Sequence, residues 1–467
     1  MLAASPDTRP KGRSVVKDLT ARLLNIKRGE LPLALLSALF FFCVLCGYFC
    51  LRPVREALGV SRGMDDLRWL FVGSSIASLV AVLAFGGIVN RFDRRRFIPL
   101  AYLFVIVCLV VFASLLIADA ARGGGLIGTE TGTDFALAVG YTYFIWLSVI
   151  NLFVNSVFWA FMVDLYDLDQ GKRMFAFIGV GGTLGAIAGS TITEAVAGMT
   201  DSVYLPAGLM LGSAALFGCA IVAMLVLDRM ATASEHSRLG KRDGRAPVEA
   251  VPASQTHGRF WDGVTAVASS PYLLGVGLFI MLLTISNTLL YFTQANVVLE
   301  RADTFSQRLA SFAQLNMLTQ TMALLTQVVI TTHLIKRFGV GWTLSLLPLI
   351  LVAGFAVLAV WPIFAVFAMF QALFRAAEYA TTRPARETLF SVIPVAQKYR
   401  AKPLIDVFIY RFGDVAGAGI DRALAALGVG LAGVAVAAVP LAAAWAALAL
   451  ALGRAQQRLD RSAAVAR

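Results

Sequence analysis

Runs of about twenty apolar residues recur along almost the whole chain, and they restrict the fold more than any other feature of the sequence. A bilayer core about 30 Å thick is crossed by a helix of roughly 20 apolar residues, whereas strands of a membrane barrel alternate in polarity over about 10 residues. The runs here are continuous, and only 15% of the residues are Asp, Glu, Lys or Arg. Soluble domains carry about 25% charge. The sequence therefore excludes a soluble fold and predicts an all-α polytopic membrane protein.

The apolar runs divide into two sets of six around one polar segment. We predict spans at approximately 31–52, 66–90, 97–119, 135–163, 174–198, 205–227, 272–299, 306–335, 340–361, 363–390, 402–427 and 429–453. The segment between the sets is rich in arginine and contains Pro247 and Pro252, so it reads as a flexible connector. The predicted organisation is a basic N-terminus (1–30), a six-helix half (31–227), a connector (228–270), a second six-helix half (271–453) and a tail (454–467).

Basic residues are distributed unevenly between the two sides of this topology. Of the 40 Lys and Arg, 28 fall in the termini, the connector and the loops on the same side, and five fall in the opposite loops. The positive-inside rule assigns the basic side to the cytoplasm. We therefore predict a multi-pass protein of the bacterial inner membrane with both termini in the cytoplasm. The other seven arginines lie within or at the ends of spans: Arg52, Arg55, Arg375, Arg383, Arg386, Arg411 and Arg422.

A short charged motif follows the second predicted span, and a degraded copy, 333–339, follows the eighth. The first copy comprises Gly87, Arg91, Asp93, Arg94 and Arg95. Together with the six-plus-six spans, the two copies resemble the cytoplasmic loop motif of the major facilitator superfamily, which joins helix ends by charge and helps to hold the outward-facing state. The resemblance implies a major-facilitator-like fold with pseudo-symmetric halves that rock around a midplane site. Ordinary positive-inside charge is the alternative reading of the motif.

Span 5 contains Gly181, Gly185 and Gly189, each four residues apart. No strand precedes them, so a phosphate-binding loop is a poor reading of this segment. Small residues at this spacing let two membrane helices approach closely. We therefore predict a helix-packing face.

Arginine and glutamate recur within spans 1 and 10 in the pattern Arg-Pro-x-Arg-Glu-x-Leu, which begins at Arg52 and again at Arg383. Charge inside a bilayer costs about 2.5 to 3.5 kcal/mol per residue on insertion scales, so such groups face each other or a wet cavity. Each proline should remove a backbone hydrogen bond and kink its helix. Because guanidinium forks bind phosphate and carboxylate oxygens in a bidentate manner, the pattern predicts an anionic substrate.

We assign two groups of residues to the predicted site, in addition to the loop motif. The candidate substrate-binding residues are Arg52, Arg55, Arg375, Glu378, Arg383, Arg386, Asn155 and Trp159. The candidate charge network, whose glutamates could carry a coupling proton, comprises Glu56, Glu387, Asp406, Arg411 and Asp414. A structural ion-pair network is the alternative for the charged residues, and core packing is the alternative for Trp159.

These residues also resemble the ATP/ADP translocase family of plastids and intracellular bacteria, which exchanges nucleotides and is distantly related to the facilitators. The matching positions are Tyr48, Leu51, Arg52, Arg55, Glu56 and Leu58, then Phe158, Trp159, Lys172, Arg173, Phe175, Gly179 and Gly181, then Pro384, Arg386, Glu387, Lys398, Arg400, Lys402, Asp406, Arg411 and Gly413. The family has Lys where this chain has Arg55 and Arg386, which keeps the charge. The family also has Lys where this chain has Asp414, which reverses the charge at that position. The resemblance thus implies nucleotide exchange, and the change at Asp414 disfavours a triphosphate.

The leading hypothesis is a secondary active transporter that moves an organic anion by alternating access, with a nucleotide or another phosphorylated or carboxylated solute as the substrate. The alternative is a non-transporting sensor or scaffold built on a transporter fold, in which the arginines would pair at dry interfaces. No nucleophile and base pair, metal-ligand spacing or Walker loop is visible. We therefore expect no enzymatic activity, catalytic residue, metal, cofactor or nucleic-acid partner, and we expect a monomer in the lipid bilayer.

Overall fold

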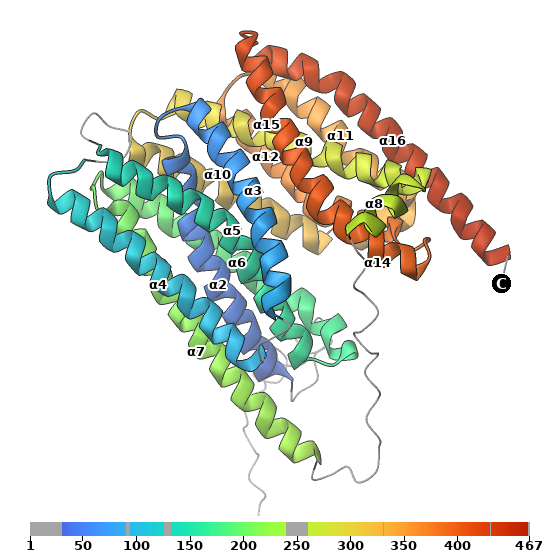
Figure 1. The fold of residues 1–467 in the computed structure, drawn as a ribbon, viewed down its shortest axis with the longest axis horizontal. Helices are drawn as coiled ribbons and strands as arrows, with labels where there is room; N and C mark the ends of the chain where they lie inside the picture. The colour runs from blue at the N-terminus through green and yellow to red at the C-terminus, as the bar shows by residue number, and fades with distance from the viewer. Residues whose placement is uncertain are drawn as a thin grey trace, which may run out of the picture.

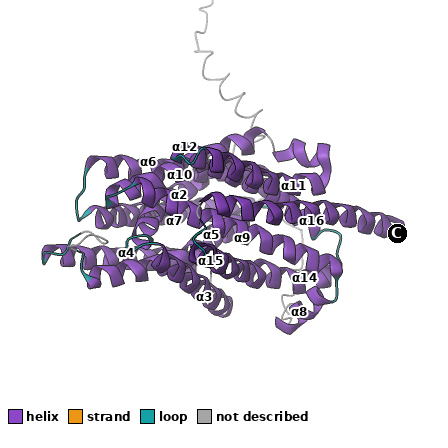
Figure 2. Cartoon of the chain, turned by 90° about the horizontal axis from the view of Figure 1, so that it is seen from above, coloured by secondary structure: helices purple, strands orange, loops and turns teal. Residues whose placement is uncertain are grey.

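The computed structural model describes residues 30–89, 94–125, 132–239, 260–329, 331–429 and 431–465, and every regular element in these ranges is helical (Figure 2). The first group of helices comprises α2 (Leu31–Gly59), α3 (Met64–Val89), α4 (Arg94–Ala121), α5 (Asp134–Leu165), α6 (Leu168–Met199) and α7 (Leu205–Leu239). We call it the N-terminal group. It occupies one side of the molecule in Figure 1.

The C-terminal group occupies the other side (Figure 1). It comprises α8 (Phe260–Ala268), α9 (Pro271–Arg301), α10 (Phe305–Val329), α11 (Thr331–Val360), α12 (Phe364–Ala377), the π-helical segment η2 (Glu378–Thr382), α13 (Arg383–Leu389), α14 (Val395–Pro403), the π-helical segment η3 (Leu404–Ile409), α15 (Tyr410–Ala426) and α16 (Leu431–Val465). Helices at most of the predicted spans therefore exist, although several bounds differ.

Nine of the described helices are long and apolar enough to cross a membrane, namely α2 to α7, α9, α11 and α16. The other three predicted spans correspond to α10, to the run from α12 to α13, and to the run from α14 to α15. Glutamine, asparagine and threonine dilute the apolar residues of α10, and π-helical segments divide the other two runs into short pieces. These are also the runs that hold most of the intramembrane charge predicted from the sequence.

Several predicted boundaries differ from the helices. The span predicted at 306–335 ends at Val329, and the next helix, α11, is interrupted by Gly339 with φ of 76°. The connector is not uniformly irregular, because α7 extends to Leu239 and α8 forms within it. Residues 240–259 lie outside the described residues. Helix α16 likewise continues to Val465, through the predicted tail.

The prolines of the repeated Arg-Pro pattern act differently in the two copies. Pro53 lies inside α2, which runs from Leu31 to Gly59 as one helix. Pro384 follows the π-helical segment η2 and lies in the first turn of α13, where a missing N–H costs little. The helical assignment is unbroken at Pro53, and a π-helical segment precedes Pro384. The kink at each proline stays a prediction.

The glycine stripe of α6 packs against α2. A Cβ at Gly181, Gly185 or Gly189 would overlap the backbone of Ala38, Phe42 or Cys46, respectively, so both stripes advance by four residues. The predicted packing face therefore has a defined partner. The C-terminal group contains a comparable pair, because Gly413 and Gly417 of α15 pack against Thr284 and Thr288 of α9.

The two groups of helices contact each other mainly through α6 with α10, α3 with α15 and α2 with α10. Arg68 Nε of α3 lies 2.8 Å from Asp421 Oδ2 of α15, and both side chains are buried. The Arg422 guanidinium lies over the ring of Trp69, 5.4 Å from its centroid. We call the end of the molecule at which α2 ends, α3 begins and these contacts lie the closed end.

Helix α10 contributes further contacts at the closed end. Gln314 Nε2 donates to Glu194 Oε1 of α6 at 2.9 Å. Ser306 Oγ donates to the carboxylate of Asp201, which follows α6. Charged and polar bonds between the groups are therefore concentrated at one end among the described residues.

The α2–α6 contact generates a stability prediction. Gly185→Val places two methyl groups against the backbone of Phe42, and overpacking of this kind costs about 1 to 3 kcal/mol. We expect a lower unfolding temperature in detergent, measured by intrinsic fluorescence. Gly179→Val on the same helix is the matched control, because a Cβ at Gly179 meets no atom within 4 Å. Equal unfolding temperatures for the two variants would contradict the packing argument.

Candidate functional site

A cavity of about 580 Å³ lies between the two groups of helices. This volume is within the range of about 300 to 1,000 Å³ that ligand pockets occupy. Its wall is formed by α2, α3, α5, α9, α12, α13, α15 and both π-helical segments, and it extends along α3 from Phe71 to Val82. The charged residues that line it are Arg55, Arg375, Glu378, Arg383, Arg386, Asp406, Arg411 and Asp414. Eight of the residues predicted from the sequence therefore share one cavity.

Glu378 is the counter-ion of two cavity arginines. Its carboxylate lies 3.1 Å from Arg375 Nη1 and 3.6 Å from Arg383 Nη2, and its side chain is 3% exposed. Arg383 is the most exposed of these side chains at 56%, and its guanidinium lies over the ring of Tyr379, 4.3 Å from the centroid. One carboxylate thus serves two guanidinium groups, and Arg383 remains accessible from the cavity.

Asn287 of α9 holds the other side of Arg375. Arg375 Nη1 donates to Asn287 Oδ1 at 2.9 Å, and Asn287 is buried and lines the cavity. Guanidinium groups only donate, so the amide oxygen must face Arg375. The amide nitrogen of Asn287 is left without a hydrogen-bond partner among the described residues.

A second cluster joins α13, α14 and η3. Arg386 Nη2 lies 3.7 Å from Asp406 Oδ1 and 3.3 Å from Glu387 Oε1. Glu387 also accepts from Lys402 Nζ at 2.6 Å, and its side chain is 46% exposed. Arg386 and Asp406 line the cavity, whereas Glu387 and Lys402 do not. Glu387 therefore anchors the edge of the site.

Asp414 and Arg411 form a third pair on α15. Arg411 Nη1 lies 3.1 Å from Asp414 Oδ2, at the i and i+3 positions that place two side chains on one helix face. Thr288 Oγ1 of α9 also donates to Asp414 at 3.4 Å. Asp414 lines the cavity although its side chain is only 8% exposed. It is both a cavity residue and the partner of a neighbouring arginine.

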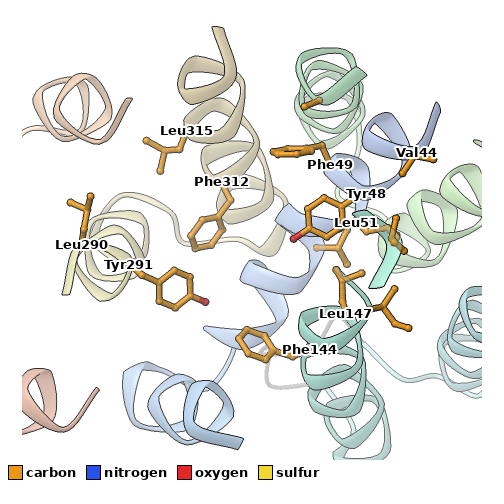
Figure 3. Close-up of a cluster of buried hydrophobic side chains, with 14 of the residues drawn as sticks. Val44, Tyr48, Phe49, Leu51, Phe144, Leu147, Leu290, Tyr291, Phe312 and Leu315 are labelled. Carbon is orange, nitrogen blue, oxygen red and sulfur yellow. The ribbon is translucent and has the colours of Figure 1, made fainter. Parts of the chain in front are cut away.

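Glu56 joins α2 to the opposite group of helices. It is buried, binds Arg55 Nη2 and lies 3.7 Å from Arg52 Nε. The Tyr291 hydroxyl of α9 also donates to Glu56. Figure 3 shows Tyr291 and Phe144 pointing toward α2 from opposite sides. Arg55 lines the cavity, donates to Ser148 at 3.1 Å and lies over Phe144. Arg52 and Glu56 are behind the cavity wall.

Two further predicted residues lie outside the cavity wall. Trp159 packs edge-on against Phe41, Phe158 and Phe175, which supports the core-packing alternative. Asn155 donates to Asn151 Oδ1 at 3.3 Å, and it is Asn151 that lines the cavity. Helix α5 therefore reaches the cavity at Asn151, one turn before Asn155.

The predicted gating motif cannot be placed in the same way. Arg91 and Asp93 lie outside the described residues, and so do the side chains of Gly87, Arg94 and Arg95. Its assignment stays a prediction from the sequence.

Sequence reasoning missed the contribution of α9. Asn287, Thr288 and Tyr291 each contact a charged residue of the site. Their spacing of one and three residues would have placed them near one face of a helix, but the predicted span 272–299 carries no charged residue to mark it. The buried pair Arg68 and Asp421 was missed because its partners are 353 residues apart.

The site presents guanidinium groups and neutral hydrogen-bond donors to one cavity. Its geometry suits an anionic ligand, because several forks can share the oxygens of a phosphate or a carboxylate. Groups of three or more His, Cys, Asp or Glu arranged to hold a metal ion are absent from the part of the chain that the structure describes.

Comparison with known proteins relates the chain to membrane transporters. The sequence model of the TLC ATP/ADP transporter family matches residues 10–454. ADP,ATP carrier protein 3 of Rickettsia conorii and that of Rickettsia felis are each 25% identical over 205 residues, which is 39% of this chain. The matched region spans 40% of the length of each carrier.

Solved structures of similar fold are also transporters. A mutant of the nucleoside transporter NupG superposes with a TM-score of 0.59 at 13% identity, covering 91% of this chain and 99% of NupG. A bacterial homolog of the human lysosomal transporter Spinster gives a TM-score of 0.59 at 12% identity, covering 93% of this chain and 99% of the homolog. At these identities the likeness shows the fold alone.

The Arg411–Asp414 pair generates a prediction about buried and exposed ion pairs. Asp414→Asn leaves Arg411 beside a neutral group, and we expect a loss of about 1 to 3 kcal/mol in unfolding free energy because Asp414 is buried. Glu387→Gln, at a side chain that is 46% exposed, is expected to cost less than about 1 kcal/mol. Thermal unfolding of both variants in detergent measures the difference. A larger loss for Glu387→Gln would contradict it.

Proposed function

The chain belongs to the TLC ATP/ADP transporter family, and we propose that it is a secondary active transporter that carries an organic anion across the membrane by alternating access. A nucleotide, or another phosphorylated or carboxylated solute, is the proposed substrate. The chain is a membrane transport protein with transmembrane helices, by its family and by its apolar helices. Substrate and mechanism are the parts that we propose.

One observation carries the proposal: five arginines from both groups of helices line one cavity. Arg55 comes from the N-terminal group, and Arg375, Arg383, Arg386 and Arg411 come from the C-terminal group. A scaffold would need these cations to be paired at dry interfaces, whereas here they border an open volume of about 580 Å³. A cavity shared by two halves of a transporter is where a rocking motion exposes a ligand to either side.

The contacts at the closed end support an alternating-access cycle. Arg68 with Asp421 and Trp69 with Arg422 join the groups there, while the cavity extends away from that end along α3. With the positive-inside orientation, the closed end faces the periplasm and the cavity faces the cytoplasm. We propose that this conformation is the inward-facing state of a twelve-helix protein in the bacterial inner membrane, with both termini cytoplasmic.

The two groups of helices correspond to the proposed halves. The boundaries predicted at 31–227 and 271–453 assign α2 to α7 to one half and α9 to α16 to the other, apart from the ends of α7 and α16. The glycine contacts of α6 with α2 and of α15 with α9 support a six-plus-six repeat, because each joins the fifth helix of a half to its first. We propose a monomeric carrier without a cofactor or an enzymatic step.

The anion proposal predicts the effect of removing a cavity cation. In proteoliposomes, we expect uptake of labelled AMP, ADP or glucose 6-phosphate that depends on the protein. Arg375→Gln should lower the uptake rate at least about tenfold, since a hydrogen bond to a charged group contributes about 1.5 to 3 kcal/mol. Arg301→Gln is the control, because Arg301 lies over Phe364 outside the cavity wall. Equal rates for both variants, or no uptake of any of these anions or of a dicarboxylate by the native chain, would contradict the proposal.

Alternating access predicts a role for the Arg68–Asp421 pair. Arg68→Gln and Asp421→Asn should each open the closed end, because Arg68→Gln leaves the buried Asp421 unpaired and Asp421→Asn leaves Arg68 with only the exposed Asp65 on its own helix. In a variant without native cysteines, Ser75→Cys in the cavity should then react with an impermeant maleimide from that side at least about tenfold faster, which corresponds to ~1.4 kcal/mol. The exchange Arg68→Asp with Asp421→Arg should restore slow labelling. Fast labelling of the variant with both exchanges would show that the ion pair between residues 68 and 421 does not hold the closed end shut.

A further inference from the structure

The cavity holds little uncompensated positive charge despite its five arginines. Five carboxylates lie within 4 Å of these guanidinium groups: Glu56 beside Arg55, Glu378 beside Arg375 and Arg383, Asp406 and Glu387 beside Arg386, and Asp414 beside Arg411. Lys402 also binds Glu387, so six cations face five carboxylates and one positive charge is left in excess. Arg52, behind the wall and also beside Glu56, raises the excess to two.

The excess charge is located where Glu378 is shared. Arg375 and Arg383 share the carboxylate of Glu378. Each of the other cavity arginines is paired with a carboxylate that contacts no second cavity arginine. Arg383 also has the longer of the two contacts, 3.6 Å, and the more exposed side chain. An anion entering the cavity therefore meets its least compensated cations at Arg375 and Arg383.

Neutral donors without partners lie beside the same two arginines. The amide nitrogen of Asn287 and the hydroxyl of Thr382 have no hydrogen-bond partner among the described residues, and the two side chains are 6% and 0% exposed. Both residues line the cavity. An unpaired buried polar group is costly, so unpaired donors in the wall of a cavity indicate a ligand that accepts from them.

We propose that Arg375, Arg383, Asn287 and Thr382 form a subsite for a single phosphate group, and that the ligand is an organic monophosphate rather than a di- or triphosphate. The inference rests on the proposed function and names its substrate class. A phosphate monoester carries about −1.5 to −2 charges at neutral pH and three acceptor oxygens, which match both the excess charge and the set of donors. Each further phosphate would bring negative charge toward Glu378, Asp406 and Asp414.

The charge argument is tested by binding of AMP, ADP, ATP and adenosine to the purified full chain by calorimetry, without divalent cations. We expect AMP to bind at least about tenfold tighter than ATP, with ADP between them and adenosine weakest. ATP binding as tightly as AMP, or more tightly, would overturn the subsite while leaving anion transport intact. Absence of binding by AMP, ADP and ATP, together with absence of uptake of any anion, would overturn both.

The position of the phosphate is tested by Thr382→Val. Replacing an unpaired buried hydroxyl by a methyl group of similar shape should leave the unfolding temperature unchanged or raise it. The affinity for AMP should nevertheless fall about fivefold or more. Thr319→Val is the matched control, because Thr319 is also buried with an unpaired hydroxyl but does not line the cavity. An unchanged affinity in Thr382→Val would place the phosphate elsewhere.

Whether the carboxylates of the cavity limit the negative charge of the ligand is tested separately by Asp406→Asn. This variant removes one carboxylate from the cavity wall, at a residue that does not contact Arg375 or Arg383. ATP should gain affinity relative to AMP, so that the ratio of the ATP dissociation constant to the AMP dissociation constant falls at least about threefold. An unchanged or wider preference would show that the number of carboxylates does not set the charge of the ligand.

Discussion

A guanidinium group inside a helical bundle needs a counter-ion or water, because removing it from water is expensive and arginine does not lose its proton. This constraint determines the arrangement of charge in the structure. The carboxylates of Glu378 and Asp414 are three residues from an arginine on the same helical run, and Glu56 is next to one. Most pairing is therefore local, and each helix can enter the membrane with its charge already offset.

Bonds between the two groups of helices are of a different kind. Arg68 with Asp421 and Tyr291 with Glu56 join residues that are more than 200 positions apart, and both lie toward the closed end. They depend on the relative position of the groups, so they are the bonds that a rocking motion must break. The close glycine contacts of α6 with α2 and of α15 with α9 lie within the groups and keep each one rigid during such a motion.

The sequence predicts what local chemistry determines. Hydropathy locates most helices, four-residue glycine spacing identifies the packing face of α6, and the charged residues within the spans identify eight residues of the cavity wall. Prediction from the sequence fails where tertiary packing determines which group a side chain faces. The sequence around Trp159 is the same whether its side chain faces a ligand or an aromatic core. Only the positions of Phe41 and Phe175 in the structure distinguish the two cases. Asn287 escapes notice because its role arises from Arg375, which lies 88 residues further along the chain.

Internal counter-ions also affect how tightly a carrier can hold its ligand. When an anion binds Arg375 and Arg383, it competes with Glu378 for the same donors, so part of the new attraction replaces an existing one. The net binding free energy is therefore smaller than the number of arginines suggests. Conduction through any membrane site requires binding that is favourable enough for entry and weak enough for release. A fully uncompensated cluster of five arginines would hold an anion more tightly than the observed cluster, in which five carboxylates offset the guanidinium groups.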